Sequence, residues 1–105
     1  MPNRTTQPAK LQGSTQNYTW DFLSNLAPGE TITSQTVTMS VYSGTDANPS
    51  AMISGAASVT NTSVVNQKLT GGVLGVIYEA LATVTTSLGQ TLAMSSFIAV
   101  VPDLP

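Results

Sequence analysis

Cysteine and histidine are both missing from this sequence of 105 residues. Their absence excludes thiol nucleophiles, imidazole bases and disulfide bonds, together with the usual ligands of zinc, haem and iron–sulfur sites. A chain of this length forms one ordinary domain and can bury a core without disulfide or metal staples. The sequence therefore predicts a single domain with no disulfide, no metal site and no cofactor.

Charged side chains are also scarce, at 8% of the chain with a net charge of −2. The cations are Arg4, Lys10 and Lys68, and the acids are Asp21, Glu30, Asp46, Glu79 and Asp103. Proteins that bind a phosphate backbone need clustered cations, so nucleic acid is not an expected partner. A glycosidase needs two opposed carboxylates, whereas these acids fall on separate elements. We therefore expect a protein that is not an enzyme.

Long apolar runs are missing as well. The first ten residues contain no apolar stretch of the kind that a secretory signal needs. The run Phe97–Val101 is far shorter than the roughly 20 residues of a membrane-spanning helix. A membrane is therefore not an expected partner.

Hydroxyl side chains dominate what is present, with 16 Thr and 12 Ser residues beside a hydrophobic fraction of 41%. This chain is too apolar for a disordered protein, and Thr and Val favour the pleated, half-buried surface of a sheet. A surface that is polar through hydroxyl and amide groups gives little charge repulsion between copies. The composition predicts an all-β domain and favours a subunit of an assembly.

Alternating residues and turn signals predict about seven short strands. The expected strands and turns are an aromatic strand at residues 17–22, a turn at 27–30, a strand at 31–42 with a bulge near Ser34, a loop at 43–50, strands at 58–65 and 76–86, a turn at 87–90 and a strand at 91–101. This spacing is typical of an antiparallel β-sandwich. We expect an extended N-terminal arm at 1–16, the sandwich at 17–101 and a C-terminal tail at 102–105.

Two stretches have alternative interpretations. Residues 51–58 are small and contain Gly55, so they fit either a short edge strand or irregular structure. Residues 75–82 could instead form a helix, because Val73, Ile77 and Leu81 fall at helical spacing. The glycines before this stretch and the threonines after it favour the strand. The aromatic residues Tyr18, Trp20 and Phe22 could stack on a sugar, but their alternation on one strand favours core positions.

A glycine-rich corner precedes the best strand. It consists of Leu69, Gly71, Gly72 and Gly75, followed by Tyr78. In immunoglobulin-type sandwiches a tyrosine near the start of strand F bonds to backbone a few residues upstream. We predict that the Tyr78 hydroxyl bonds to backbone between Leu69 and Gly75. Ala80 stands where an antibody domain has its second cysteine, so the pattern predicts an immunoglobulin-like sandwich without the disulfide.

Two other motifs carry little chemistry. Asp46 and Asn48 share a loop, but one carboxylate is too few for a calcium ion that needs six to eight oxygen ligands. The glycines at 71–75 are followed by no Lys-Ser/Thr pair, so they do not form a phosphate-binding loop.

The corner and a second motif resemble small immunoglobulin-like virion proteins of tailed bacteriophages. The shared pattern is Leu-x-Gly-Gly-x-x-Gly-x-x-Tyr and a strand ending Thr-Thr-x-x-Gly, here Leu69, Gly71, Gly72, Gly75, Tyr78, Thr85, Thr86 and Gly89. The second motif is an aromatic strand followed by Leu-Ala-x-Gly-Asp/Glu-Thr-Ile, here at residues 26–32. The chain departs from the family in lacking a tryptophan soon after the Thr-Ile pair and in ending on an uncharged strand. The family's partner surface therefore does not carry over residue by residue.

The resemblance implies a structural virion protein, a fibre–tail or head–tail adaptor at the neck or tail. Its partners would be other virion proteins (portal, tail, fibre or capsid) and copies of itself in a homo-oligomer, assembled in the bacterial host cytoplasm. The alternatives are a capsid decoration protein and an immunoglobulin-like adhesive or carbohydrate-binding module. We further expect the N-terminal arm or the tail to dock on a neighbouring subunit, with packing on its own domain as the competing hypothesis.

Overall fold

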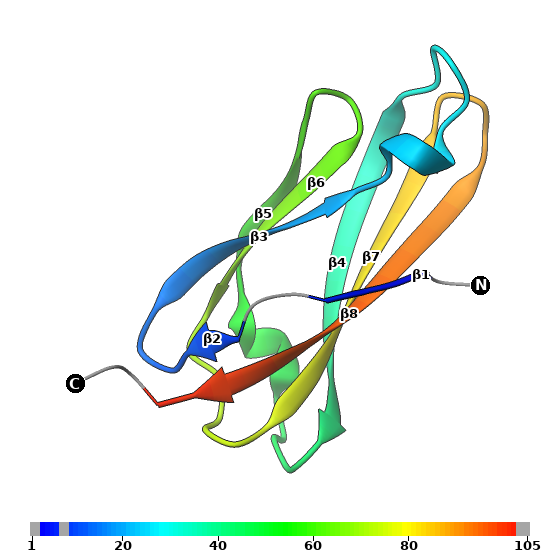
Figure 1. Cartoon of the computed structure of the whole chain (residues 1–105). Coiled ribbons are helices and arrows are strands. Elements are labelled where there is room, and N and C mark those ends of the chain that lie inside the picture. Colours follow the sequence, from blue (N-terminus) through cyan, green and yellow to red (C-terminus); the bar gives the residue numbers. More distant parts are fainter. Residues whose placement is uncertain (1–2, 7–8, 103–105) are drawn as a thin grey trace.

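The computed structural model describes residues 3–6 and 9–102 as an all-β fold of two sheets (Figure 1). The strands are β1 (Asn3–Thr6), β2 (Lys10–Leu11), β3 (Thr15–Asp21), β4 (Ile32–Ser43), β5 (Ile53–Thr60), β6 (Val64–Thr70), β7 (Ile77–Thr86) and β8 (Thr91–Val101), with short 3₁₀ turns η1 (Leu23–Asn25) and η2 (Pro49–Met52). One sheet has the order β1-β8-β7-β4 with β2 also beside β8, and the other has the order β3-β6-β5.

Alternation of small and apolar side chains explains the central strand β7. Tyr78, Ala80, Ala82 and Val84 all point inward and are buried, while Glu79 and its alternate neighbours face outward. Because the period of a strand is two, one register places the whole apolar set in the core. The residues that could have formed a helix at 75–82 therefore lie in a turn and a strand.

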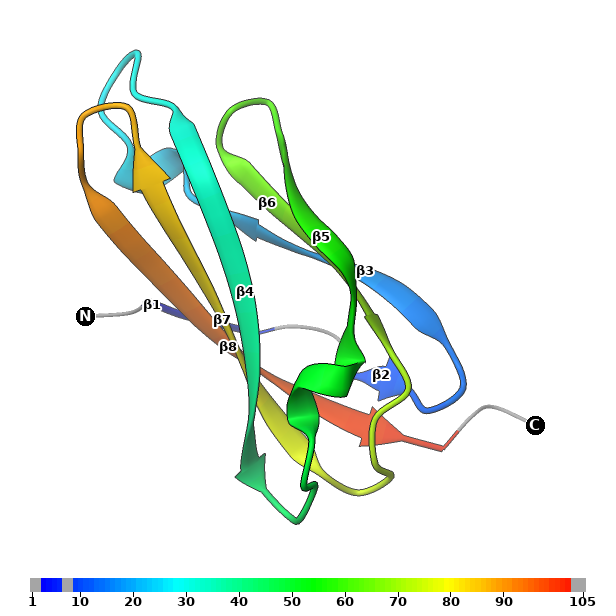
Figure 2. The same cartoon turned by 180° about the vertical axis from the view of Figure 1, so that it is seen from behind.

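The core lies between the two sheets, which face each other in a sandwich-like arrangement (Figure 2). The three-stranded sheet contributes Tyr18, Trp20, Val65 and Leu69, and the larger sheet contributes residues of β4, β7 and β8. The indole N–H of Trp20 donates to the Ser96 hydroxyl across the core at 3.0 Å. This bond satisfies a buried donor and ties β3 to β8.

The N-terminal residues differ from the expected arm. Asn3–Thr6 and Lys10–Leu11 pair with β8 in parallel, and β3 already begins at Thr15. These residues are therefore part of the five-stranded sheet of their own chain, and the sheet is mixed where wholly antiparallel pairing was expected. Residues 1–2 and 7–8 of the expected arm, and residues 103–105 of the expected tail, lie outside the described residues.

The prediction of one continuous strand at 58–65 is wrong, because this stretch contains a hairpin turn. β5 ends at Thr60 and β6 begins at Val64. Asn61 and Thr62 adopt left-handed backbone angles, with φ values of 53° and 62°, and so reverse the chain. The ambiguous stretch at 51–58 divides between the end of η2 and the strand β5.

The remaining expected elements lie close to their predicted bounds. β4 occupies Ile32–Ser43 and shifts its register against β7 between Ile32 and Ser34, where the sequence predicts a bulge. β7 and β8 form the final hairpin around the turn at 87–90, and β8 has the expected bounds of Thr91–Val101.

Candidate functional site

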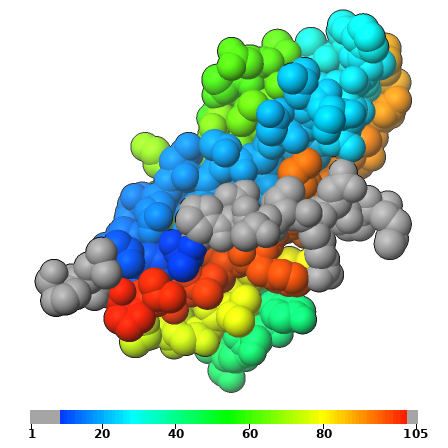
Figure 3. All heavy atoms as spheres, in the orientation of Figure 1, coloured from blue at the N-terminus to red at the C-terminus, as the bar shows by residue number. Residues whose placement is uncertain are grey.

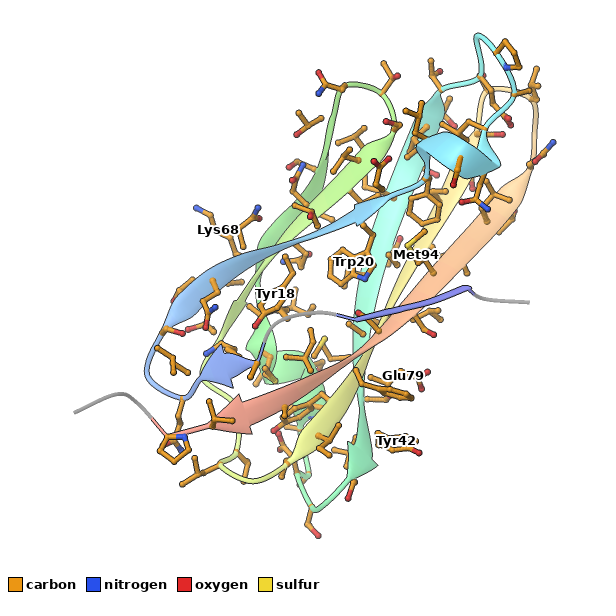
Figure 4. The ribbon with its side chains drawn as sticks, in the orientation of Figure 1. Tyr18, Trp20, Tyr42, Lys68, Glu79 and Met94 are labelled. Carbon is orange, nitrogen blue, oxygen red and sulfur yellow. The ribbon has the colours of Figure 1, made fainter. Side chains whose placement is uncertain are left out.

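The aromatic residues of β3 belong to the core. Tyr18, Trp20 and Phe22 are each at most 2% exposed. Figure 4 shows Tyr18 and Trp20 between the two sheets. Burial also raises the pKa of the Tyr18 hydroxyl. No face of these rings is available to stack on a sugar, so the structure offers no carbohydrate platform on this strand.

The Tyr78 hydroxyl connects two loops to the start of β7. The Val73 N–H donates to it at 2.8 Å, within the segment where the sequence predicts its backbone partner. The same hydroxyl donates its proton to Asp46 Oδ2 at 2.7 Å. The Asp46 contact was not predicted, because the loop at 43–48 is far from Tyr78 in sequence. One buried side chain thus holds the loop after β4 against the loop before β7.

The hydrogen bond between Tyr78 and Asp46 shifts the pKa of both groups. Burial raises the pKa of Tyr78, and the hydrogen bond to Asp46 raises it further. The hydrogen bond from Tyr78 lowers the pKa of Asp46, and the bond from the Asn48 N–H adds to this effect. The pair is therefore a charge-assisted hydrogen bond that serves as a structural clasp at neutral pH.

The glycines of the corner have different roles. At Gly72, where φ is 100°, an added Cβ would lie 2.8 Å from Val100 Cγ2 and 3.2 Å from Met52 Cε. Close packing and the left-handed angle therefore both require glycine at this position. Gly71 and Gly75 also have positive φ, but open space surrounds their Cβ positions. Leu69 is fully buried in the core beneath this corner.

A hollow of about 310 Å³ lies beside the corner. Its lining residues are Asp46, Asn48, Ala51, Met52, Thr70, Gly71, Gly72 and Val73. Asp46 and Asn48, which the sequence places on one loop, both line this hollow. However, the structure contains no group of three or more His, Cys, Asp or Glu residues that could hold a metal ion within its described part.

Large exposed apolar side chains gather at the two ends of the molecule. Leu23 in η1 is 65% exposed and Leu88 in the β7–β8 turn is 63% exposed. These two segments lie together at the upper end in Figures 1 and 3. Near them, the Ser87 N–H donates to Thr31 O and the Thr31 N–H donates to Ser87 Oγ, which ties the β7–β8 turn to the chain just before β4.

The opposite end carries the second group, Tyr42, Val73 and Leu74. Tyr42 near the end of β4 is 60% exposed, and Val73 and Leu74 in the corner loop are 41% and 46% exposed. The Tyr42 ring packs on Phe97 of β8 with 4.3 Å between ring centroids. Figure 4 shows Tyr42 at the lower end of the ribbon. Exposed aromatic and aliphatic groups of this kind are typical of protein contact surfaces.

Three buried polar residues could not be identified from the sequence, because nothing in their local pattern marks them. Lys10 is fully buried and donates to the carbonyls of Leu11, Ser14 and Gly71. Glu30 accepts from the Ala27 N–H at 2.8 Å and from the Thr86 hydroxyl.

The third missed residue is Gln67, on β6. Its amide donates to the carbonyls of Ser54, Gly55 and Lys68. The first two carbonyls lie where the register of β5 against β6 is interrupted. Gln67 therefore satisfies backbone groups that the ladder leaves unpaired, which is a structural rather than a chemical role.

These observations define the class of protein: a small two-sheet β domain that exposes large apolar side chains at both of its ends. No helix in the part of the chain that the structure describes is long and apolar enough to cross a membrane. The model of a family described as podophage GP4 fiber-tail adaptor protein gp77 matches residues 10–99, and the chain belongs to that family. No curated protein matches the chain.

Family membership confirms the resemblance to phage adaptor proteins and gives the chain a structural role in the phage virion. The match includes β2 through most of β8, and so contains both the Tyr78 corner and both exposed ends.

Proposed function

We propose that this protein joins a fibre to the tail by binding one virion protein at each end of its long axis. The observation that carries the proposal is the division of the exposed apolar groups between the two ends of a molecule of 45 × 24 × 20 Å. A subunit that bridges two partners needs two separate contact surfaces, and this elongated domain keeps them apart. The family's description as a fiber-tail adaptor supports the same role.

The scaffold for this role is an immunoglobulin-like sandwich. The order β3-β6-β5 matches the B-E-D order of such domains, and β4-β7-β8 matches C-F-G. Tyr78 then stands near the start of strand F and takes a hydrogen bond from backbone five residues upstream, as a tyrosine corner does. The first strands pair with β8 rather than with β3, which differs from the constant-type arrangement.

The proposed contacts require neither catalysis nor a cofactor. Both ends expose large apolar side chains, with Asp21 beside Leu23 at one end and Asp46 beside Val73 at the other, so their partners would present apolar residues of matching shape. Portal or capsid proteins are the alternative partners, and binding to capsid protein would indicate a decoration subunit instead.

Paired variants test the two-ended role. Leu23→Asp/Leu88→Asp alters the upper end and Tyr42→Asp/Leu74→Asp alters the lower end, while Asn17→Asp/Ser58→Asp places the same charges on exposed positions of the small sheet. Binding of each folded variant to the purified fibre protein and to the purified tail protein is measured separately. Each end variant should lose one partner and keep the other, and the control should keep both. Loss of neither partner, or of the same partner from both ends, would contradict the proposal.

A further inference from the structure

The strand β4 leaves one edge of the five-stranded sheet open. It is the last strand in the sheet order and pairs only with β7. The outer edge of β4 is covered near its start. There the Ile32 N–H donates to Thr62 O at 3.0 Å, and the Gln35 side-chain amide donates to Ala57 O at 3.0 Å. The elements η2 and β5 also lie near β4. Among the described residues, however, no hydrogen bond from either element reaches β4 beyond Gln35, so alternate N–H and C=O groups of its outer edge are left for another strand.

The other sheet edges each carry a feature that discourages pairing. β1 has four residues and β2 has two. β5 contains Gly55 at a φ of 76°, and its register against β6 is broken between Ser54 and Ser58. β3 is shielded by β2 at its start, where the Leu11 N–H donates to Gln16 Oε1 at 3.0 Å, and it ends on the charged Asp21. Natural proteins protect their sheet edges by such short, irregular or charged strands.

The strand β4 lacks these features over most of its length, because its register against β7 shifts only near its ends, between Ile32 and Ser34 and between Val41 and Ser43. It is 12 residues long and contains no charged residue, no proline and no glycine. Its pairing with β7 is uninterrupted from Ser34 to Val41, so this part of the edge is regular. A long regular edge without protection is a template for another strand.

We propose that β4 pairs antiparallel with β4 of a second copy of this chain, about a two-fold axis at Thr38. In this register Thr36 lies opposite Ser40 of the other copy, and the two Thr38 residues lie opposite each other. Residues opposite one another in an antiparallel pair share a face of the sheet, so hydroxyl groups meet on the outer face. On the inner face Val37 lies opposite Met39, which joins the two cores along the seam.

Self-complementarity and neutrality identify the occupant as a second copy. Every outward residue of β4 from Ser34 to Ser40 bears a hydroxyl group, and the inward residues Val37 and Met39 are buried apolar groups. The strand thus offers the same chemistry that it would accept, and it carries no charge that would repel its own copy. The two copies run in opposite directions, so the ends of each stay free for the fibre and tail contacts, on which this pairing does not depend.

Variants of β4 that carry opposite charges test the pairing between two copies of this strand. Thr36→Lys/Thr38→Lys and Thr36→Glu/Thr38→Glu alter exposed side chains of β4 and place like charges across the proposed seam. The wild-type chain should be a dimer by light scattering after size exclusion, each variant alone should be a monomer, and an equimolar mixture of the two should be a dimer again. The control Asn17→Lys/Thr19→Lys on β3 should remain a dimer.

The absence of cysteine makes a second, positional test possible. Thr38→Cys should form an intermolecular disulfide under mild oxidation, because its two copies lie opposite each other at the axis, and Thr19→Cys should not. A wild-type chain that is monomeric at its solubility limit would overturn the proposal. So would a mixture of charged variants that stays monomeric, which would indicate that β4 accepts a segment of a different protein. Loss of fibre or tail binding by the end variants would affect neither result.

Discussion

Tyr78 holds three segments together through one hydroxyl group. It accepts from the Val73 N–H, donates to the Asp46 carboxylate and anchors its ring in the core at the start of β7. The corner loop contains the exposed residues Val73 and Leu74, and the loop after β4 directly follows the exposed Tyr42. The arrangement of the lower end therefore depends on a buried side chain that is not itself exposed there.

Replacement of Tyr78 by phenylalanine should destabilise the fold. The change keeps the buried ring but leaves the Val73 N–H and the Asp46 carboxylate without this partner, a loss of about 1–3 kcal/mol in the free energy of unfolding. Urea denaturation measures the difference. Tyr42→Phe, which removes an exposed hydroxyl, is the matched control and should change stability little. Equal stability of Tyr78→Phe and wild type would show that the clasp contributes nothing.

The same clasp predicts the alkaline dependence of stability. Burial and then the Asp46 hydrogen bond raise the pKa of Tyr78 above its ordinary value of 10.0. The folded chain keeps this proton when the unfolded chain loses it, so the free energy of unfolding falls as pH rises beyond 10. The free energy of unfolding of Tyr78→Phe should fall less steeply with pH than that of the wild type over this range. Urea titrations at a series of pH values measure both curves. Parallel curves would contradict the assignment.

At acidic pH the free energy of unfolding changes in the opposite direction, because it falls as the pH falls. The Tyr78 hydrogen bond holds the pKa of Asp46 below its ordinary 3.8. The stabilisation that this ionised group provides is complete above that value and is lost as pH falls below it. Asp46→Asn should remove part of the acid-induced loss, seen as a shallower fall in urea midpoint below pH 3.8. An unchanged acid profile would indicate that other carboxylates carry the whole effect.

Among the elements, β2 shows how a two-residue strand can be fixed by one side chain. Its Lys10 crosses from beside β8 to the carbonyl of Gly71 in the corner and also bonds to Leu11 and Ser14. The lysine thereby connects the N-terminal segment to the loop that Tyr78 holds. Residues 3–6 and 10–11 pair with β8 of their own chain. For these residues the structure agrees with the competing hypothesis, in which the N-terminal segment packs on its own domain.

Substitution of Lys10 should therefore lower stability where substitution of the other lysine does not. Lys10→Met keeps an apolar stem of similar length but removes the donor to the Ser14 and Gly71 carbonyls, at a cost of about 1–3 kcal/mol for each one that water cannot reach. The Leu11 carbonyl keeps the Ser14 N–H and hydroxyl as donors. Lys68→Met on the outer face of β6 is the control. Thermal melting of both variants measures the contrast, and equal melting temperatures would show that the N-terminal segment does not support the domain.

Elements with a local signal could be predicted from the sequence. β7 and β8 follow from alternating side chains and the Ser87–Gln90 turn, and the core position of Trp20 follows from the alternation of β3. The strands β1 and β2 could not be predicted, because parallel pairing with β8 depends on a partner more than 80 residues away and leaves no local periodicity. The turn at Asn61 was missed because the Thr and Val residues around it favour strands, although residues 60–63 form an unbroken polar run.

At the site, the corner was predictable and its surroundings were not. Tyr78 and the glycines before it form a recognisable local pattern, whereas Asp46 and Lys10 reach the corner only through the fold. The exposed ends were also hidden from sequence reasoning. Leu23 and Leu88 have no feature that distinguishes an exposed leucine from a core one until the turns that carry them are placed.

The molecule as a whole is elongated and has unlike features on its ends, faces and edges. Apolar groups mark the two ends, hydroxyl groups cover the outward side of β4, and the outer face of the small sheet carries Asn17, Lys68 and other polar residues. In our proposals, the ends bind partner proteins and one sheet edge binds a second copy of the chain. An adaptor built in this way can hold a copy of itself and two different neighbours at once.

Cryo-electron microscopy of the intact virion tests the adaptor role most directly, because it shows which protein each end of the domain touches. We predict that the domain lies at the junction of fibre and tail, with the Leu23 and Leu88 end against one of these proteins and the Tyr42 and Leu74 end against the other. A domain found on the capsid shell, or one whose two ends contact the same partner, would contradict the account.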